Sequence, residues 1–230
     1  MTGNALAVEQ LSKHYRAGTR EEVRALQDIS LAIPPGSFVA LVGPSGSGKT
    51  TLLSLLGGLD RPTAGSVRFG GRELAACSDV ELARLRRRMG FVFQGLSLVS
   101  GLPAWENVTY PLVPRAVSSR ERLRLAADVL TRLDLADKVQ TPPEELSGGE
   151  QQRVAVARAL VGTPEVIFAD EPTSNLDRAS AGELAGLLSE IHAEGTTLVI
   201  STHDADLIQS ASLVFTLEEG RLVDVTDQEA

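Results

Sequence analysis

Two kinds of hydrophobic pattern occur along the chain and predict its strands. Apolar and polar residues alternate over residues 6–11 and 25–33, and this period of two predicts half-buried strands. Short, wholly apolar runs predict strands that are covered on both faces, and they occupy residues 38–42, 166–169 and 197–200. Weaker patterns predict short strands at 66–69 and 90–93, and a closing hairpin of 213–217 and 221–225 around Glu219 and Gly220.

Helical patterns lie between these strands. Residues 50–56, 80–89 and 179–192 have helical character; the first of these helices ends at Gly57 and Gly58, and the second carries a solvated basic face with Arg84, Arg86, Arg87 and Arg88. From about residue 98 to 160 there is little strand pattern. Ser118 and Glu121 form a capping-box pattern there, apolar residues at helical spacing follow, and a second helix is expected after Ser147. The order of elements predicts an α/β fold with a mainly parallel sheet and a helical insert at about 98–160.

Composition narrows the class of protein. The 230 residues are 43% hydrophobic and 23% charged, which is typical of a globular domain and excludes a disordered, collagenous or wholly coiled-coil chain. The formal charge of −8 argues against general nucleic-acid binding, which needs cations to displace counterions from phosphates. The single cysteine favours a reducing compartment, and no signal peptide or membrane-spanning run is recognised. We therefore expect a soluble, intracellular domain.

The strongest local motif is a glycine-rich loop between a predicted strand and a predicted helix. It satisfies the pattern G-x-x-x-x-G-K-[ST] with Gly43, Pro44, Ser45, Gly46, Ser47, Gly48, Lys49 and Thr50. Glycines let backbone N–H groups wrap around an anion, and the following helix offers the positive end of its dipole. Lys49 is placed to reach the β- and γ-phosphates of a nucleotide, Thr50 to bind Mg²⁺ and Thr51 to contact the α-phosphate. The alternative is a simple glycine turn that caps a helix.

A pair of acids follows the apolar strand 166–169. Downstream of a phosphate-binding loop, an aspartate in the position of Asp170 is suited to hold Mg²⁺ through water. Glu171 comes next and is placed to polarise an attacking water. Alone, two acids at a strand end are also typical of a solvated strand end. Together with the glycine-rich loop, they predict a P-loop NTPase.

A second glycine motif, Leu146-Ser147-Gly148-Gly149-Glu150, precedes a predicted helix. Ser147 and Glu150 complete a capping box, which explains the serine and the glutamate but does not require two glycines. Gly148 and Gly149 leave bare backbone at a helix N-terminus, and such a terminus favours anions. The motif therefore predicts a second anion-binding surface in a chain that already has one.

Over nearly its whole length, the chain resembles the ATP-binding subunits of ABC transporters. The matching positions are Tyr15, 43–50, Gln94, 146–150 with Gln151, Gln152 and Arg153, 166–171, 174–177 and His203. The resemblance implies one nucleotide-binding domain over 1–230, a P-loop NTPase with a mainly parallel central sheet, an antiparallel β subdomain and an inserted α-helical subdomain. It also implies a homodimer in which two copies face head to tail. Each ATP would then lie between one P-loop and the partner's Ser147, Gly148 and Gly149.

The same match implies further roles within that site. Tyr15 would stack on adenine, and Gln94 would bind Mg²⁺ with Thr50 and Asp170 or position the attacking water. Asp177 would lie at the dimer seam, and Glu150 and Asp177 would both belong to the nucleotide-binding residues. The alternatives are an ordinary edge-strand tyrosine, a surface amide and, for Asp177, an N-cap of the following helix.

The resemblance also assigns the catalytic step, which is hydrolysis of the γ-phosphate of ATP by water. Glu171 would orient or deprotonate the water, and His203 would contact the γ-phosphate and orient Glu171. Lys49, Mg²⁺ and the loop N–H groups would stabilise the developing charge. The alternative for His203 is a satisfied core histidine. ATP would join the two subunits and hydrolysis would release them.

A finer resemblance is to the macrolide-exporter and lipoprotein-release branch (MacB- and LolD-like ATPases), with the cell-division ATPase FtsE as a near relative. It rests on residues 58–63, 90–94, 106–108, 169–173 and 175–177. The branch implies a separate FtsX- or MacB-like membrane permease and a cytoplasmic ATPase that is peripheral on the inner face of the membrane. The chain departs from the branch at Leu96, Ser100 and Trp105, in the segment where the family's permease docks.

Two other classes of protein are alternatives to a transporter subunit. A soluble ABC ATPase that acts on ribosomes or DNA usually carries two cassettes or a long coiled-coil insert, and the acidic charge of this chain argues against it. A P-loop kinase would need an acceptor site and a lid, and it would leave residues 146–150 unexplained. The preferred hypothesis is an ATP-hydrolysing subunit of an export or lipoprotein-release type of ABC transporter, and the first alternative is an FtsE-like cell-division ABC ATPase.

Overall fold

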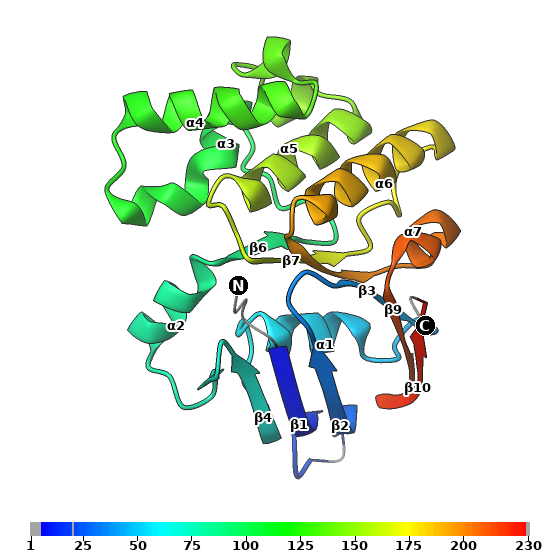
Figure 1. Ribbon diagram of the computed structural model, residues 1–230. Coiled ribbons are helices and arrows are strands. Elements are labelled where there is room, and N and C mark those ends of the chain that lie inside the picture. Colours follow the sequence, from blue (N-terminus) through cyan, green and yellow to red (C-terminus); the bar gives the residue numbers. More distant parts are fainter. Residues whose placement is uncertain (1–5, 20, 229–230) are drawn as a thin grey trace.

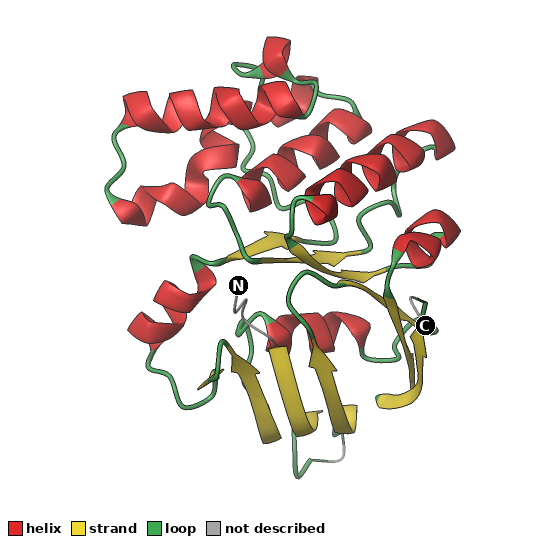
Figure 2. Ribbon diagram, in the orientation of Figure 1, coloured by secondary structure: helices red, strands yellow, loops and turns green. Residues whose placement is uncertain are grey.

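The computed structural model describes residues 6–19 and 21–228, and their strands form two sheets (Figures 1 and 2). The larger sheet has the strand order β10-β9-β3-β8-β7-β6, and every neighbouring pair is parallel except β9 and β10. Its strands are β3 (Phe38–Val42), β6 (Met89–Val92), β7 (Val166–Asp170), β8 (Thr197–Ser201), β9 (Leu213–Glu218) and β10 (Arg221–Asp227). This arrangement confirms the predicted mainly parallel sheet and the closing hairpin.

The smaller sheet is antiparallel and has the order β2-β1-β4-β5. Its strands are β1 (Leu6–Tyr15), β2 (Val23–Ile33), β4 (Ala64–Phe69) and β5 (Arg72–Glu73). Leu6 pairs with Ile33 on one side and with Phe69 on the other, and all three side chains are buried. The alternating patterns of the sequence therefore correspond to strands with one buried face, as predicted.

Helices cover both faces of the central sheet (Figure 1). Helix α1 (Lys49–Leu56) lies between the two sheets, whereas most of the other helices lie beyond the opposite face. Those helices are α3 (Ala104–Thr109), α4 (Ser119–Arg132), α5 (Gly148–Leu160), α6 (Arg178–Ala193) and α7 (Ala205–Ser210), with 3₁₀ turns at Tyr110–Arg115, Ala136–Lys138 and Pro143–Glu145. The stretch between β6 and β7 contains only helices and loops, in agreement with the predicted helical insert.

The central strands separate two hydrophobic clusters. Phe38 and Ala40 of β3 pack into the cluster beneath the helical region, while Val39 and Leu41 pack into the cluster that holds α1 and the smaller sheet. Successive side chains of a strand point to opposite faces, so a strand between two cores must be apolar at every position. This geometry explains the continuous apolar runs in the sequence.

The predicted helix over 80–89 is wrong at its C-terminal end. Helix α2 (Asp79–Arg86) ends three residues earlier, because Met89 opens β6 and pairs with Val166. The expected solvated basic face is also wrong in part: Arg88 forms a two-point ion pair with Glu165 and lies over the ring of Phe69. Local periodicity favoured a longer helix, and pairing with a distant strand determined the observed end.

One predicted cap is only half formed. Ser118 accepts a hydrogen bond from the Glu121 N–H at the start of α4, but the Glu121 carboxylate is paired with Arg124. The predicted capping box at Ser118 is therefore a simple serine N-cap, which satisfies one of the free N–H groups of the first turn.

We expect Gly90→Ala to lower the free energy of unfolding by about 1–3 kcal/mol. A Cβ at Gly90 would lie 2.7 Å from the Ala159 carbonyl oxygen, so α5 and β6 would be forced apart. Urea denaturation would measure the change. Gly186→Ala on α6 is the matched control: a Cβ there meets nothing within 4 Å, and alanine should stabilise the helix by up to about 1 kcal/mol. Equal stability of the two variants would contradict the close contact.

Candidate nucleotide site

The glycine-rich loop joins β3 to α1 in a conformation that two of its glycines make possible. Gly43 has φ 140° and Gly48 has φ 106°, both in the region that side chains rarely adopt. A Cβ at Gly43 would lie 2.0 Å from the Leu217 carbonyl oxygen, and one at Gly48 would lie 2.6 Å from that of Ala25. Gly48 is the N-cap of α1 and offers no side-chain acceptor, so the N–H groups of the first turn are left for a ligand.

Two polar groups are enclosed by this loop. Lys49 is only 7% exposed, and its ammonium donates to the Gly43 carbonyl oxygen at 2.7 Å and to the Pro44 carbonyl oxygen at 3.1 Å. The Ser47 hydroxyl is buried and has no hydrogen-bond partner among the residues that the structure describes. A buried cation beside an unpartnered hydroxyl and free N–H groups suits a bound phosphate.

The two acids predicted from the sequence lie at the end of β7. Asp170 is 9% exposed and accepts a hydrogen bond from the Ser201 hydroxyl of β8. The chain turns at Glu171, which has φ 48° and whose N–H donates to the Ser201 carbonyl oxygen at 3.0 Å. His203 Nε2 lies 3.2 Å from Glu171 Oε1, so the two residues expected to act together are in contact. Ser201 was not among the predicted site residues, because a single serine at a strand end carries no distinctive pattern.

These groups line one cavity of about 550 Å³, within the range of small-molecule sites. Its lining is Tyr15, Val23, Arg24, Ala25, Ser45, Gly46, Ser47, Gly48, Lys49, Thr50, Thr51, Gln94, Asp170, Glu171, Ser174 and His203. The structure thus brings together most of the residues predicted from the sequence. Sequence reasoning missed residues 23–25, which reach the cavity because β2 pairs with β1. Ser174 lies in the family match at 174–177, but no role in the site was predicted for it.

Thr50, Gln94 and Asp170 supply a hydroxyl, an amide and a carboxylate to the same cavity. Oxygen donors of this kind are the ligands that Mg²⁺ prefers, together with water and substrate phosphates. No cluster of three or more His, Cys, Asp and Glu residues with metal-binding geometry occurs in the part of the chain that the structure describes. The donor set therefore fits a hard cation held jointly with a nucleotide.

The second glycine motif forms the N-terminus of α5, outside this cavity. Its capping box is complete: the Ser147 hydroxyl accepts from the Glu150 N–H at 3.3 Å, and the Glu150 carboxylate accepts from the Ser147 N–H at 2.8 Å. Ser147 and Gly148 are exposed. None of residues 147–149 lines the cavity around Lys49, so one copy of the chain does not bring its two glycine motifs together.

The starts of α5 and α6 lie side by side. A Cβ at Gly149 would be 3.2 Å from the Ser180 hydroxyl. Asp177 is the N-cap of α6 and accepts from the N–H groups of Ala179 and Ser180, each at 3.0 Å. Hydrogen bonds from Ser180 are the main reason that the pKa of Asp177 lies below its usual value. The predicted N-cap alternative for Asp177 is confirmed.

The glycine-rich loop, the enclosed lysine and the two acids at a parallel strand end define the chain as a P-loop nucleotide-binding protein. Comparison with known proteins identifies the family within this class. Residues 26–174 match the ABC transporter family. The chain belongs to this family and is one of its ATP-binding, ATP-hydrolysing domains.

Individual relatives agree with the family assignment. The chain is 46% identical over 222 residues to the macrolide export ATP-binding/permease protein MacB of Nitrosomonas europaea, with 95% of this chain but 34% of that protein covered. It therefore spans about a third of the length of this relative. It is 42% identical to the uncharacterised ABC transporter ATP-binding protein YvrO of Bacillus subtilis, covering 95% of both chains. Among solved structures, the dimeric ATP-binding cassette MJ0796 bound to ADP and Pi is similar with a TM-score of 0.89, 37% identity and coverage of 96% and 98%.

Within the described residues, no helix has both the length and the apolar character needed to span a bilayer.

Glu150 should give the capping box a pH-dependent contribution to stability. Its pKa lies below the ordinary value of 4.5, chiefly because the Ser147 N–H donates to it, and the Lys138 ammonium 3.4 Å away adds to this effect. A carboxyl with a lowered folded pKa stabilises the fold fully above its unfolded pKa and loses this effect as the pH falls through the folded pKa. We expect Glu150→Gln to lower the melting temperature at pH 7, and the difference from wild type to shrink as the pH falls below about 4.5.

Differential scanning calorimetry from pH 3 to 8 would measure this difference. Glu145→Gln, which changes an exposed carboxylate outside the box, is the control and should show a smaller difference at pH 7. A difference between Glu150→Gln and wild type that does not vary with pH would contradict the electrostatic explanation.

Proposed function

We propose that two copies of this domain close head to tail around two ATP molecules, and that this cycle drives a membrane permease. The separation of the two glycine motifs carries the proposal. The cavity around Lys49 can receive a triphosphate, whereas residues 147–149 present a second anion-favouring helix tip on another surface. A second copy would supply the helix tip that each cavity lacks. The dimeric form of the similar cassette MJ0796 supports this arrangement.

In this proposal, the residues of one copy bind and prepare the nucleotide. Tyr15 stacks on the base, and the loop N–H groups and Lys49 hold the phosphates. Thr50, Gln94 and Asp170 would hold Mg²⁺, which would supply positive charge beside the phosphates. Glu171 orients or deprotonates the attacking water, and the contact with His203 restrains its carboxylate. Groups placed in advance around the developing charge supply most of the rate enhancement.

ATP would favour the closed dimer because it contacts both copies, and hydrolysis would remove that advantage. A ligand shifts a conformational equilibrium only by its difference in affinity for the two states. The residues that create this difference are Ser147, Gly148 and Gly149 of the opposite copy, with Asp177 at the seam. Closing and opening of the dimer would then change the conformation of the bound permease.

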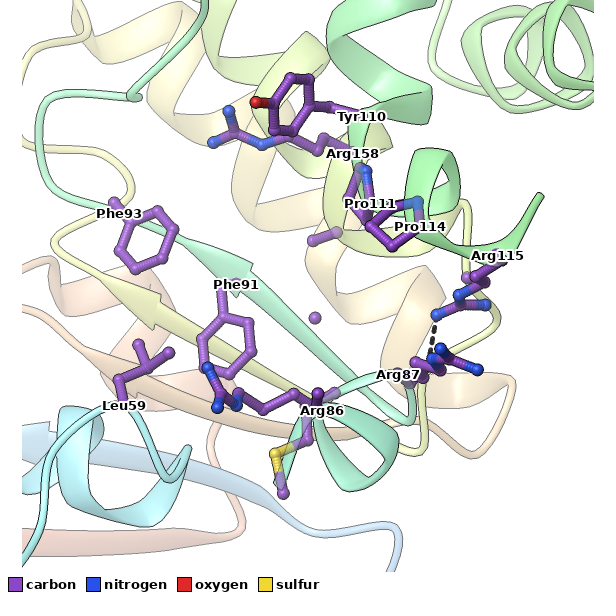
Figure 3. Close-up of a pocket in the computed structure, with 15 residues that line it drawn as sticks. Leu59, Arg86, Arg87, Phe91, Phe93, Tyr110, Pro111, Pro114, Arg115 and Arg158 are labelled. Atoms are coloured by element: carbon purple, nitrogen blue, oxygen red, sulfur yellow. Dashed lines mark hydrogen bonds between the residues drawn. The ribbon is translucent and has the colours of Figure 1, made fainter. Parts of the chain in front are cut away.

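A second cavity, of about 460 Å³, is the proposed docking place for that permease (Figure 3). It lies between β6 and the helical region and is rimmed by Arg86, Arg87, Arg115 and Arg158. Tyr110 and Phe93 expose their rings beside it, and no acidic side chain is among the described residues that line it. An exposed apolar surface with one sign of charge is typical of a protein interaction site.

The cavity is joined to the segment that follows Gln94. Arg158 of α5 donates to the carbonyl oxygens of Leu96 and Ser97, each at 2.6 Å. Arg115 donates to the Arg87 carbonyl oxygen at 2.9 Å, the contact drawn in Figure 3. A permease bound here would therefore lie beside the segment that follows Gln94, one of the proposed Mg²⁺ ligands. The likeness to macrolide export ATP-binding/permease proteins supports an export type of system.

We expect Glu171→Gln to lower ATP turnover by about 100-fold or more, because it removes the proposed catalytic base. ATP should still bind, and an ATP-dependent dimer should accumulate because the nucleotide is no longer cleaved. Phosphate release would measure turnover, and light scattering with size-exclusion chromatography would measure the dimer. Wild-type turnover in this variant would refute the role of Glu171.

Ser147→Arg in the Glu171→Gln background tests the contact between copies. The bulky cation at the helix tip should abolish the ATP-dependent dimer, while ATP binding to each copy stays unchanged because residues 147–149 lie outside the cavity. If the dimer persists, the proposed sandwich is wrong.

Tyr110→Ala tests the permease-docking surface. Tyr110 is 57% exposed and is not part of the nucleotide cavity, so basal ATPase activity should stay within about twofold of wild type. Recovery of a permease from solubilised membranes, measured by mass spectrometry, should fall at least about fivefold. Val225→Ala, which changes an equally exposed apolar side chain on β10, is the matched control and should leave recovery unchanged. Equal recovery of the permease with both variants would contradict the proposed docking surface at Tyr110.

A further inference from the structure

The Tyr15 side chain is held by two residues that have no place in the mechanism above. Its hydroxyl donates to Asp60 Oδ2 at 3.0 Å, and Asp60 lies 45 residues later in the chain. The other oxygen of the same carboxylate accepts from the Lys13 ammonium at 2.7 Å. That ammonium also lies over the Tyr15 ring, 4.8 Å from its centroid. Tyr15, Asp60 and Lys13 thus contact one another in all three pairs, and the Thr51 side chain also hydrogen-bonds the Tyr15 hydroxyl.

Further hydrogen bonds join Tyr15, Asp60 and Lys13 to the loop of residues 60–63 and to strand β1. Lys13 also donates to the Arg61 carbonyl oxygen at 2.7 Å, and the Arg61 N–H donates to Asp60 Oδ1 at 2.7 Å. Thr63 ties the same loop to the β1 strand, since its N–H donates to the Ser12 carbonyl oxygen at 2.8 Å. The loop of residues 60–63 follows α1, so it connects the helix of the glycine-rich loop to the strand end that carries Tyr15.

The contacts restrict the ring in two ways. The hydroxyl bond limits rotation of a side chain that is otherwise 39% exposed, and Lys13 occupies one face of the ring. A flat ligand in the cavity must therefore stack on the other face. A side chain that is already ordered loses less conformational entropy on binding than a free one.

The charge of Asp60 is maintained in this position. Partial burial acts to raise its pKa, but hydrogen bonds from Lys13, the Arg61 N–H and Tyr15 outweigh that effect, so the pKa lies below the usual value. Asp60 is therefore ionised at neutral pH and accepts from both neighbours.

We propose that Asp60 and Lys13 are positioning residues that hold the Tyr15 ring as a platform for the base of the nucleotide. They set the affinity for the base without contacting the phosphates. The inference rests on the proposed stacking role of Tyr15 and deepens it, because it assigns the orientation of the ring to residues outside the cavity lining.

The test compares two ligands that share the phosphate site and differ in the base. Calorimetry on the full chain, carried out without Mg²⁺ to suppress hydrolysis, would measure the dissociation constants of ADP and of tripolyphosphate. We expect Tyr15→Ala to weaken ADP binding about tenfold. Tyr15→Phe, Asp60→Ala and Lys13→Met should each weaken it about threefold, and none of the four should change tripolyphosphate binding. In a double-mutant cycle, Asp60→Ala should cause no further loss when Tyr15 is already alanine.

Glu9→Gln is the matched control, since Glu9 lies on the same strand and forms an ion pair with Arg68 away from the cavity. It should bind both ligands as wild type does. The inference is overturned, with the stacking role intact, if only Tyr15→Ala weakens ADP binding. It is also overturned if Asp60→Ala weakens tripolyphosphate binding equally or adds fully to Tyr15→Ala, because Asp60 would then act through the loop fold. Wild-type ADP binding by Tyr15→Ala would refute the proposed stacking itself.

Discussion

The nucleotide site depends on how closely the backbone of the glycine-rich loop approaches its neighbours. The loop is wedged between β9 of the central sheet and β2 of the antiparallel sheet, with Gly43 against Leu217 and Gly48 against Ala25. The turn at Gly220 closes the arrangement: its N–H donates to the Ser47 carbonyl oxygen and its carbonyl oxygen accepts from the Gln27 N–H. Contacts this close exclude a side chain at either loop glycine. The two sheets thus hold the curved backbone of the loop that is suited to bind phosphate.

The same constraint places the chemistry at one edge of the central sheet. The carboxyl ends of β3, β7 and β8 lie next to one another, so Lys49, Asp170 and His203 face a common cavity. In open parallel sheets, ligands bind at this edge because the loops that leave the strands converge there. Ser201 of β8 fixes the Asp170 carboxylate through its hydroxyl and the Glu171 backbone through its carbonyl oxygen. His203 contacts the Glu171 carboxylate.

Much of this organisation could be predicted from the sequence because it depends on local chemistry. Continuous apolar runs identified the strands with two buried faces, and the glycine-rich loop was identified from its own residues. The end of α2 could not be predicted, because Met89 belongs to β6 only through its pairing with Val166. The role of Asp60 could not be predicted either, because its contact with Tyr15 joins residues that lie 45 positions apart in the chain. Residues 23–25 were missed for this reason too, while the catalytic roles themselves remain predictions.

Helix α5 carries a different feature at each end. Its first turn presents Ser147 and Gly148 at the surface. In its last turn, Arg158 donates hydrogen bonds to the backbone that follows Gln94. Thirteen residues of α-helix span about 20 Å, and an uninterrupted helix of this length is stiff. A displacement of the backbone at residues 96–97 would therefore act directly on the same helix that presents Ser147 and Gly148 at its other end.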